Sequence, residues 1–303
     1  MTRLFDGVRT LLTTRPVILL LISAVLSTVC SPAQAISVSD RPTSRPDSRP
    51  DLRSDAALVI DADSSSVLYA RHENSPKPIA SLTKLMTALV VLEGRQSLDE
   101  EIVMTGEDRA GTRGAASRLA VGAKLTRGDL LHLALMASDN RAAYALARTY
   151  PGGKVAAIDA MNAKARSLGM TNTRFAEPSG LSPENTASAS DIAKLLLAAA
   201  NRPIIRDYST DHRFSLQLNK RATEFRNTNY LVAKSDWEID IQKTGYTSKA
   251  GECLAMKTTI DGRSMVIVLL DSFGKYTRTA DARRIRKWLE ARSMRVARSA
   301  VSP

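Results

Sequence analysis

Cysteine is nearly absent from this chain of 303 residues, which holds only Cys30 and Cys253. Two cysteines allow at most one bridge, and Cys30 lies in a segment that we expect to be removed from the mature protein. The mature chain would then keep one cysteine and form no intramolecular disulfide. Its stability must therefore come from a hydrophobic core, and the chain is long enough for one large domain or two smaller ones.

Histidine and aromatic residues are also scarce. His72, His132 and His212 are far apart and show no spacing typical of metal ligands, so we expect neither a metal nor another cofactor. Aromatic residues make up 5% of the chain and are not interleaved with basic ones, which argues against a nucleic-acid partner although the net charge is +12. An anionic polymer or a membrane surface explains the positive charge equally well.

A membrane-spanning run is missing as well, because the apolar stretch from Val17 to Cys30 is too short to cross a bilayer. Arginines precede this stretch, and Ala33-Gln34-Ala35 after it forms an A-x-A cleavage pattern. We interpret residues 1–35 as a secretory signal peptide that is cleaved. The mature protein is then expected to be exported, with at most a peripheral association with membranes.

Strand patterns lie at both ends of the remaining chain, with helical patterns between them. Residues 36–54 are rich in Arg-Pro, Ser and Asp, which indicates a flexible linker. We expect a folded domain at 55–295 and a basic tail at 296–303. The stretch from about 95 to 200 is largely helical by periodicity. This order predicts an α+β fold: one antiparallel sheet of about five strands flanked by helices, with an inserted all-α subdomain.

Individual elements follow from local patterns. Strands are expected at 57–60, 67–70, 239–244, 252–260 and 264–271. Helices are expected at 81–93, 155–168 and 283–292. Capping-box spacing at Thr126–Asp129 and at Ser188–Asp191 marks two more helix starts. The dipeptide Asp261-Gly262 predicts a tight hairpin turn between the last two strands.

Ser81 and Lys84 lie three residues apart at the start of a very apolar helix. Side chains at that spacing share a helix face, so the Lys84 amine can reach the Ser81 hydroxyl. A serine needs such a base to become a nucleophile, and burial plus a second cation, Lys243, would lower the pKa of Lys84. The same spacing recurs at Ser272–Lys275, but there it follows a strand and includes a glycine, so we expect a loop without catalytic meaning.

Two further triplets each occur once: Ser138-Asp139-Asn140, in a turn between helices, and Lys243-Thr244-Gly245, at the end of a strand. Taken singly, each has an ordinary interpretation: the first would cap a helix, and Lys243 would be a surface charge at a strand end. A chance occurrence of both triplets after a Ser-x-x-Lys, in this order, is much less probable than a chance occurrence of any one of the three. The combination therefore favours a catalytic site.

In this order, "SLTK", "SDN" and "KTG" resemble the signatures of the penicillin-binding protein and serine β-lactamase superfamily. The stretches "FRNTNYLV", "KTGYTSKAGECL" and "LALMASDNRAAYALARTYPGG" are similar to the D-alanyl-D-alanine endopeptidases among low-molecular-mass penicillin-binding proteins, and the similarity spans about residues 56–288. The resemblance implies a β-lactamase/transpeptidase-like fold and a periplasmic serine D,D-peptidase. It also implies peptidoglycan stem peptides as substrates and β-lactam antibiotics as covalent inhibitors.

The resemblance also assigns roles to single residues. Ser81 would be the nucleophile, Lys84 its base and Ser138 the group that passes a proton to the leaving amine. The residues expected to hold the substrate are Asn140, Lys243, Thr244, Gly245 and Tyr246. Among these, the backbone N–H of Tyr246 would form an oxyanion hole together with that of Ser81.

Three alternative functions are compatible with parts of the sequence. A β-lactamase needs a deacylation base, and Glu177 lacks the Glu-x-x-Leu-Asn context of class A enzymes. A D-alanyl-D-alanine carboxypeptidase commonly carries an additional β-rich domain, for which the residues after 271 leave no room. A non-catalytic receptor for wall peptide or β-lactam would not need Lys84. We therefore expect an endopeptidase, while a role for Lys249 stays open.

Overall fold

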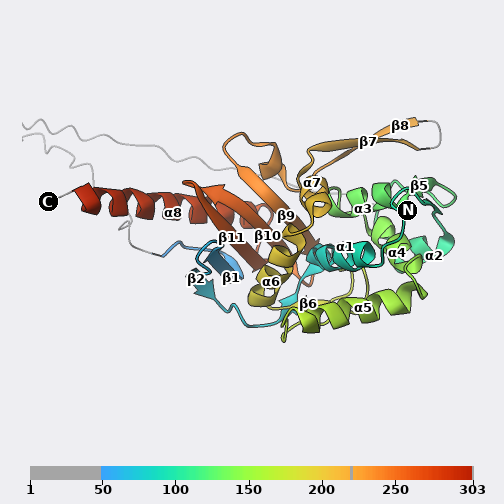
Figure 1. Cartoon of the computed structure of the whole chain (residues 1–303), viewed down its shortest axis with the longest axis horizontal. Helices are drawn as coiled ribbons and strands as arrows, with labels where there is room; N and C mark the ends of the chain where they lie inside the picture. The colour runs from blue at the N-terminus through green and yellow to red at the C-terminus, as the bar shows by residue number, and fades with distance from the viewer. Residues whose placement is uncertain (1–48, 219–220, 302–303) are drawn as a thin grey trace, which may run out of the picture. The chain divides into compact units, whose positions relative to one another are not determined.

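The computed structural model describes residues 49–218 and 221–301 (Figure 1). The predicted signal peptide and all but the last residues of the predicted linker lie outside these ranges, so they stay predictions. Within the described ranges, none of the helices combines the length and the apolar character that crossing a membrane requires.

A five-stranded antiparallel sheet forms one half of the molecule, in the order β2-β1-β11-β10-β9. It joins the N-terminal and C-terminal parts of the domain, because β1 pairs with β11. The strands are β1 (Ser54–Asp61), β2 (Val67–Arg71), β9 (Glu238–Thr247), β10 (Gly251–Ile260) and β11 (Arg263–Ser272). The prediction of one antiparallel sheet of about five strands is confirmed. Asp261 and Gly262 both have positive φ, as the predicted tight turn requires.

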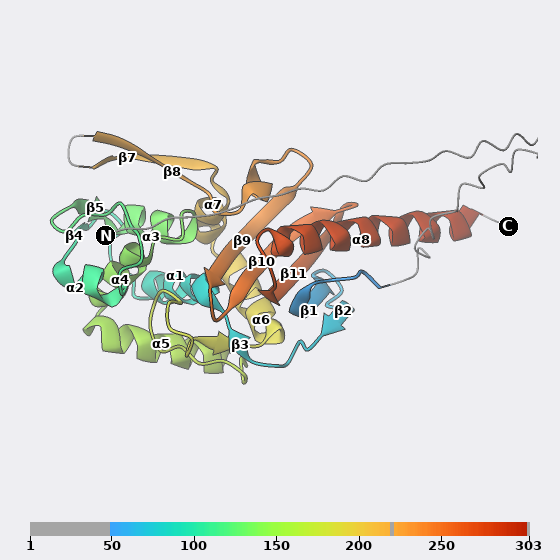
Figure 2. The same ribbon diagram turned by 180° about the vertical axis from the view of Figure 1, so that it is seen from behind.

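Apolar residues of the sheet serve two separate cores. Along β1, Ala56 and Leu58 face the core shared with the helical half, whereas Ala57 and Val59 face a second core under α8 (Thr277–Val301). Alternation of side chains along a strand places neighbours on opposite faces, so both sets are buried. Figure 2 shows α8 lying across the second face, while α6 (Ala189–Ala200) covers the first.

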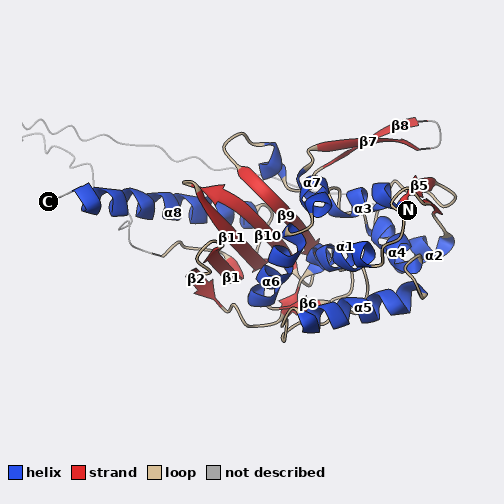
Figure 3. Cartoon of the chain, in the orientation of Figure 1, coloured by secondary structure: helices blue, strands red, loops and turns tan. Residues whose placement is uncertain are grey.

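The other half is mostly helical (Figure 3). Its remaining helices are α1 (Thr83–Glu93), α2 (Gly106–Gly111), α3 (Arg127–Leu135), α4 (Asn140–Arg148), α5 (Gly153–Ser167) and α7 (Pro203–Thr210). Both predicted capping positions are confirmed: Thr126 and Ser188 accept hydrogen bonds from the backbone N–H groups three residues later. The region predicted as all-α also holds the short strands β4 (Glu101–Val103), β5 (Lys124–Thr126) and β6 (Thr186–Ala187), which are too short to produce a pattern.

A two-stranded hairpin was missed by the sequence analysis. It consists of β7 (Arg213–Leu218) and β8 (Arg221–Arg226) and extends over the helical half (Figure 1). The alternation in Phe214-Ser215-Leu216-Gln217-Leu218 is the signal that could have found it. After β8, the chain passes through a 3₁₀ turn, η2 (Tyr230–Ala233), into the edge strand β9.

The C-terminal helix is anchored to the N-terminal strand by a buried carboxylate. Asp281 accepts hydrogen bonds from the backbone N–H groups of Arg53 and Ser54 and from the Ser54 hydroxyl, at 2.6 to 2.9 Å. Trp288 packs edge-on against Tyr69, with 6.3 Å between the ring centroids. Trp288 belongs to the second core with residues of the sheet, and α8 is longer at both ends than the helix predicted at 283–292.

Candidate active site

Ser81 lies in a single turn of 3₁₀ helix, η1 (Ala80–Leu82), between the short strand β3 (Lys77–Pro78) and α1. The sequence analysis placed it in the first turn of the α-helix itself. Ala80 has φ of +46°, an uncommon backbone conformation for a residue with a side chain. The Thr83 hydroxyl donates to the Ala80 carbonyl at 2.8 Å and stabilises this entry into the helix. Ser81 is therefore held, half-buried, at the start of a buried element.

Lys84 is fully buried, with its amine directed at Ser81. Its Nζ lies 2.8 Å from Ser81 Oγ, 2.7 Å from Asn140 Oδ1 and 2.6 Å from the Ser179 carbonyl oxygen. The first and second sequence motifs thus meet at this amine. The third contact is made by Ser179, which belongs to none of the three motifs and was not predicted.

Burial lowers the pKa of Lys84 to about 8, against the opposing effect of the Glu177 and Asp139 carboxylates. Lys243 is also fully buried, and its pKa is lowered well below the usual value by burial and then by the positive charges of Lys84 and Arg278. Of the two causes expected to lower the pKa of Lys84, burial is confirmed, whereas Lys243 is not among the groups that shift it. Burial is the main cause of the lowered pKa at Lys84, whereas repulsion between the two cations lowers the pKa of Lys243.

Ser138 lies in the loop between α3 and α4 with φ of +59°. The residue that caps α4 is Asp139, which accepts from the backbone N–H of Ala142 at 3.0 Å, so Ser138 and Asn140 are not the cap. A left-handed conformation in a non-glycine residue costs on the order of 1 kcal/mol and is typical of functional loops. Asn140 follows and reaches Lys84, while Ser138 faces a cavity on the side of the hairpin.

Strand β9 brings the third motif against η1. The Lys243 amine donates to the Thr244 carbonyl at 3.1 Å, and the burial of this side chain contradicts the alternative of a surface charge. Gly245 packs directly on Ser81: a Cβ at position 245 would lie 2.9 Å from the Ser81 nitrogen. Tyr246 follows Gly245 on β9 and its ring is exposed, while its role in an oxyanion hole stays a prediction.

The loop from 177 to 185 supports the site and escaped the sequence analysis except for Glu177. The Glu177 carboxylate accepts from the Ser179 N–H at 2.9 Å, from the Ser179 hydroxyl at 2.6 Å and from Asn185 Nδ2 at 3.0 Å. Gly180, with φ of +89°, packs against the Ala80 carbonyl so closely that no Cβ could be accommodated. Glu177 therefore holds the carbonyl of Ser179 in place for Lys84.

Two further residues orient the edge strand. The hydroxyls of Thr228 and Thr244 lie 2.6 Å apart. Arg278, at the start of α8, donates to the Gly245 carbonyl at 2.7 Å and forms an ion pair with Glu252 at 3.3 Å. Neither residue belongs to one of the three motifs, although Thr228 lies in the quoted stretch "FRNTNYLV", because each meets β9 only in the folded chain.

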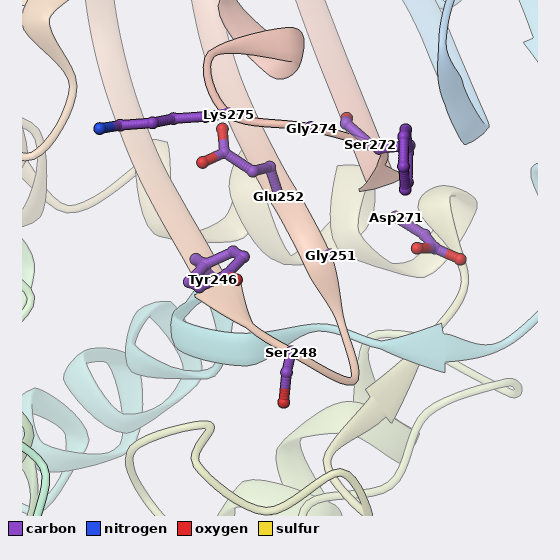
Figure 4. A pocket seen from close by; sticks show the side chains of 9 residues that line it. Tyr246, Ser248, Gly251, Glu252, Asp271, Ser272, Gly274 and Lys275 are labelled. Carbon is purple, nitrogen blue, oxygen red and sulfur yellow. The ribbon is translucent and has the colours of Figure 1, made fainter. Parts of the chain in front are cut away.

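Figure 4 shows the second Ser-x-x-Lys pair, at the rim of a cavity of about 600 Å³ that Tyr246 also lines. Lys275 extends away from Ser272 in this view. The Ser272 hydroxyl is instead 2.7 Å from that of Ser54, and the Lys275 amine lies 5.1 Å from the ring centroid of Tyr276. The loop predicted for this pair begins one residue later than expected, because Ser272 is the last residue of β11, and the two side chains make no contact typical of a nucleophile and its base.

A serine alcohol beside a buried amine of lowered pKa, under the edge strand of an antiparallel sheet, defines a serine hydrolase of the Ser–Lys type. The family of D-alanyl-D-alanine carboxypeptidases, peptidase family S11, matches the chain over residues 43–274. The chain belongs to this family and is a serine peptidase of the cell wall that acts on D-alanyl-D-alanine peptides.

Similar proteins agree with this assignment. The chain is 45% identical to a D-alanyl-D-alanine endopeptidase of Pseudomonas aeruginosa, over 86% of this chain and 84% of the relative. It is 46% identical to a D-alanyl-D-alanine endopeptidase of Escherichia coli, over 78% and 77%. The solved Streptomyces K15 DD-transpeptidase superposes with a TM-score of 0.74 at 25% identity, covering 80% of this chain and 98% of that one. The predicted penicillin-binding/β-lactamase fold is therefore confirmed.

Proposed function

We propose that this protein is an exported endopeptidase that hydrolyses D-alanyl–diamino-acid crosslinks of peptidoglycan through an acyl-enzyme on Ser81. The observation that carries the proposal is the 2.8 Å contact between Ser81 Oγ and the buried Lys84 amine, whose pKa burial lowers to about 8. A lysine with this pKa is neutral in a useful fraction of molecules near neutral pH.

The first step forms the bond between Ser81 and the substrate. The neutral Lys84 amine takes the hydroxyl proton, Ser81 Oγ attacks the D-alanyl carbonyl carbon, and the negative charge moves to the carbonyl oxygen. Backbone N–H groups of Ser81 and Tyr246 would stabilise that oxyanion. The C–N bond then breaks as the Lys84 ammonium gives up its proton and the Ser138 hydroxyl relays a proton to the leaving amine, which leaves an ester on Ser81 and a neutral Lys84.

Water completes the cycle by attacking the ester carbon: its hydroxyl group stays on the D-alanyl carbonyl carbon, its other proton goes to Ser81 Oγ, and the stem is released with a free carboxyl group. Asn140, Lys243, Thr244 and Gly245 would position the stem along the edge of β9. An extended peptide can pair with such an edge because its backbone N–H and C=O groups are available. Because residue 245 is a glycine, β9 can pack directly against the turn that carries Ser81, which keeps the strand edge next to the nucleophile.

Penicillins would acylate the same serine, and we expect the resulting ester to be long-lived. A fast deacylation base must hold a water with a free carboxylate oxygen. In this structure the Glu177 carboxylate is taken up by the N–H and hydroxyl groups of its own loop. This arrangement supports a peptidase rather than a β-lactamase.

The choice of endopeptidase over carboxypeptidase is supported by the similar proteins. Those at 45% and 46% identity are named endopeptidases, whereas a carboxypeptidase of Bacillus subtilis is 32% identical. Export to the periplasm with cleavage after Ala35 belongs to the same proposal, and N-terminal sequencing of the mature protein tests it.

The test of the activity is a side-by-side digestion of purified crosslinked peptide dimers and uncrosslinked pentapeptides. Cleavage of the dimers into monomers supports the proposal. Release of terminal D-alanine from pentapeptides, with dimers left intact, contradicts it. Ser81→Ala serves as the matched inactive control, because it removes only the oxygen that forms the ester.

A further inference from the structure

A cavity of about 540 Å³ lies beside Ser138, on the side of the β7–β8 hairpin. Its walls are three separate segments: 116–118 from the helical half, 137–139 from the loop before α4, and 224–226 from β8. A cavity of this volume is in the range that holds a small peptide or sugar group. None of its residues except Ser138 carries a role in the reaction proposed above.

Thr228, which follows β8, makes contacts both with the loop that lines the cavity and with the third motif of the site. Its backbone N–H donates to the Met136 carbonyl at 3.2 Å, just before the Ser138 loop. Its hydroxyl lies 2.6 Å from that of Thr244 in the third motif. The segment after β8 is thus hydrogen-bonded next to the Ser138 loop and to the Lys243-Thr244-Gly245 motif. Because Ser138 lines this cavity and would protonate the leaving amine in the proposed reaction, the leaving stem would lie on the side of the cavity.

Arg118 is the cation that the cavity presents. Its guanidinium carbon lies 3.8 Å from the ring centroid of the buried Phe225, and one of its nitrogens donates to the Glu224 carbonyl at 2.6 Å. These two contacts fix the plane of the side chain before any ligand arrives. Among the described residues, Arg118 has no carboxylate within 4.0 Å, so most of its five N–H donors stay free for a ligand.

The other charged groups around the cavity are already engaged. Glu224 is shared by Arg226 at 2.8 Å and Arg213 at 3.5 Å. Asp139 accepts from the Ser117 hydroxyl at 2.7 Å and caps α4. Two arginines, Arg118 and Arg226, and two carboxylates, Asp139 and Glu224, line the cavity. Because Arg226 is paired with Glu224, Arg118 is the lining arginine that forms no ion pair among the described residues.

We propose that this cavity is the subsite for the leaving stem, and that Arg118 binds a carboxylate of the diamino acid whose amine is released. The proposal rests on the endopeptidase function proposed above. A carboxypeptidase releases one alanine, whereas an endopeptidase must accommodate a whole second stem beyond the scissile bond. A planar guanidinium held in advance binds a carboxylate in a defined orientation at low entropic cost.

The experiment compares two crosslinked dimers that differ in one group, a free carboxylate or a carboxamide on the leaving diamino acid. The values of kcat/KM for both dimers are measured with the wild-type protein, Arg118→Gln and Arg118→Glu. Arg174→Gln is the matched control, because Arg174 is an exposed arginine outside the cavity. Labelling with penicillin counts the molecules in each preparation whose Ser81 is functional.

We expect the wild-type protein to prefer the free carboxylate by about tenfold, the size of one charge-assisted hydrogen bond. Arg118→Gln should reduce this preference to near one, and Arg118→Glu should favour the carboxamide. Arg174→Gln should keep the wild-type preference. A preference that survives in both Arg118 variants overturns the subsite while the endopeptidase function stands. A wild-type protein that labels with penicillin but cleaves neither dimer overturns both.

Discussion

The backbone nitrogen of Ser81 lies 2.9 Å from the point that a Cβ of residue 245 would occupy. The same point lies 3.0 Å from the Ala80 Cβ and from the Ile79 carbonyl oxygen. The edge strand and the nucleophile are therefore packed without room for a methyl group, and the position of one determines the position of the other.

The first prediction follows from this contact. Gly245→Ala should displace η1 or β9 by a few tenths of an ångström, lower the penicillin acylation rate at least tenfold and cost about 1–3 kcal/mol of unfolding free energy. Stopped-flow acylation and urea unfolding measure the two effects. Gly106→Ala is the control, since its Cβ would meet no atom within 4 Å. An acylation rate equal to that of the wild type would show that the contact is not critical.

The second prediction concerns pH. Acylation requires neutral Lys84, and the pKa of this lysine is lowered to about 8. Its neutral fraction grows tenfold per pH unit below that value and saturates above it. The acylation rate constant should therefore rise with pH, with a midpoint near 8 and a plateau beyond. A rate that is flat between pH 6 and 9 would exclude a titrating amine as the base.

Removal of the amine is a separate test. Lys84→Met keeps most of the side-chain volume in the buried site but cannot accept the Ser81 proton. We predict that acylation falls by 10² or more, the usual contribution of a general base, while circular dichroism still shows a folded protein. Its natural control is Ser81→Ala, which should not label at all. A folded Lys84→Met protein that acylates at the normal rate would remove Lys84 from the mechanism.

Glu177 offers a prediction in which stability and pH dependence change together. Its charge raises the pKa of Lys84, so Glu177→Gln should lower that pKa further and move the midpoint of the acylation profile below 8. The amide also offers fewer acceptors to the Ser179 and Gly180 N–H groups, at a cost of about 1–3 kcal/mol. Glu184→Gln, an exposed change in the same loop, should do neither. An unmoved midpoint would contradict the electrostatic link.

The last prediction concerns the attachment of α8 to β1. Asp281→Ala leaves the Arg53 and Ser54 N–H groups without their acceptor and should lower the unfolding free energy by roughly 3 kcal/mol. Asp240→Ala removes a half-exposed partner of Lys257 and should cost below about 1 kcal/mol. Equal losses in the two variants, measured by urea unfolding, would show that the buried carboxylate does not anchor the helix.

Local patterns were enough to predict most of the framework. Short apolar runs indicated the strands of the sheet, and Thr126 and Ser188 were identified as helix caps from their spacing alone. These features depend on residues close in the chain, whose geometry is set by the backbone itself. The hairpin of β7 and β8 was missed although its alternation was present, because its strands are mostly exposed and lack the apolar character of core strands.

The sequence by itself determined which alcohol and which amine could react, because Ser81 and Lys84 are neighbours on one turn and need no distant contact to meet. Only the tertiary structure decided the properties of that amine. Burial lowers the pKa of the Lys84 amine, and the Glu177 carboxylate raises it. Glu177 and the Ser179 carbonyl beside the amine belong to a segment nearly a hundred residues away. Desolvation and charge act through space, so a pKa is a property of the folded neighbourhood and cannot be read from a local pattern.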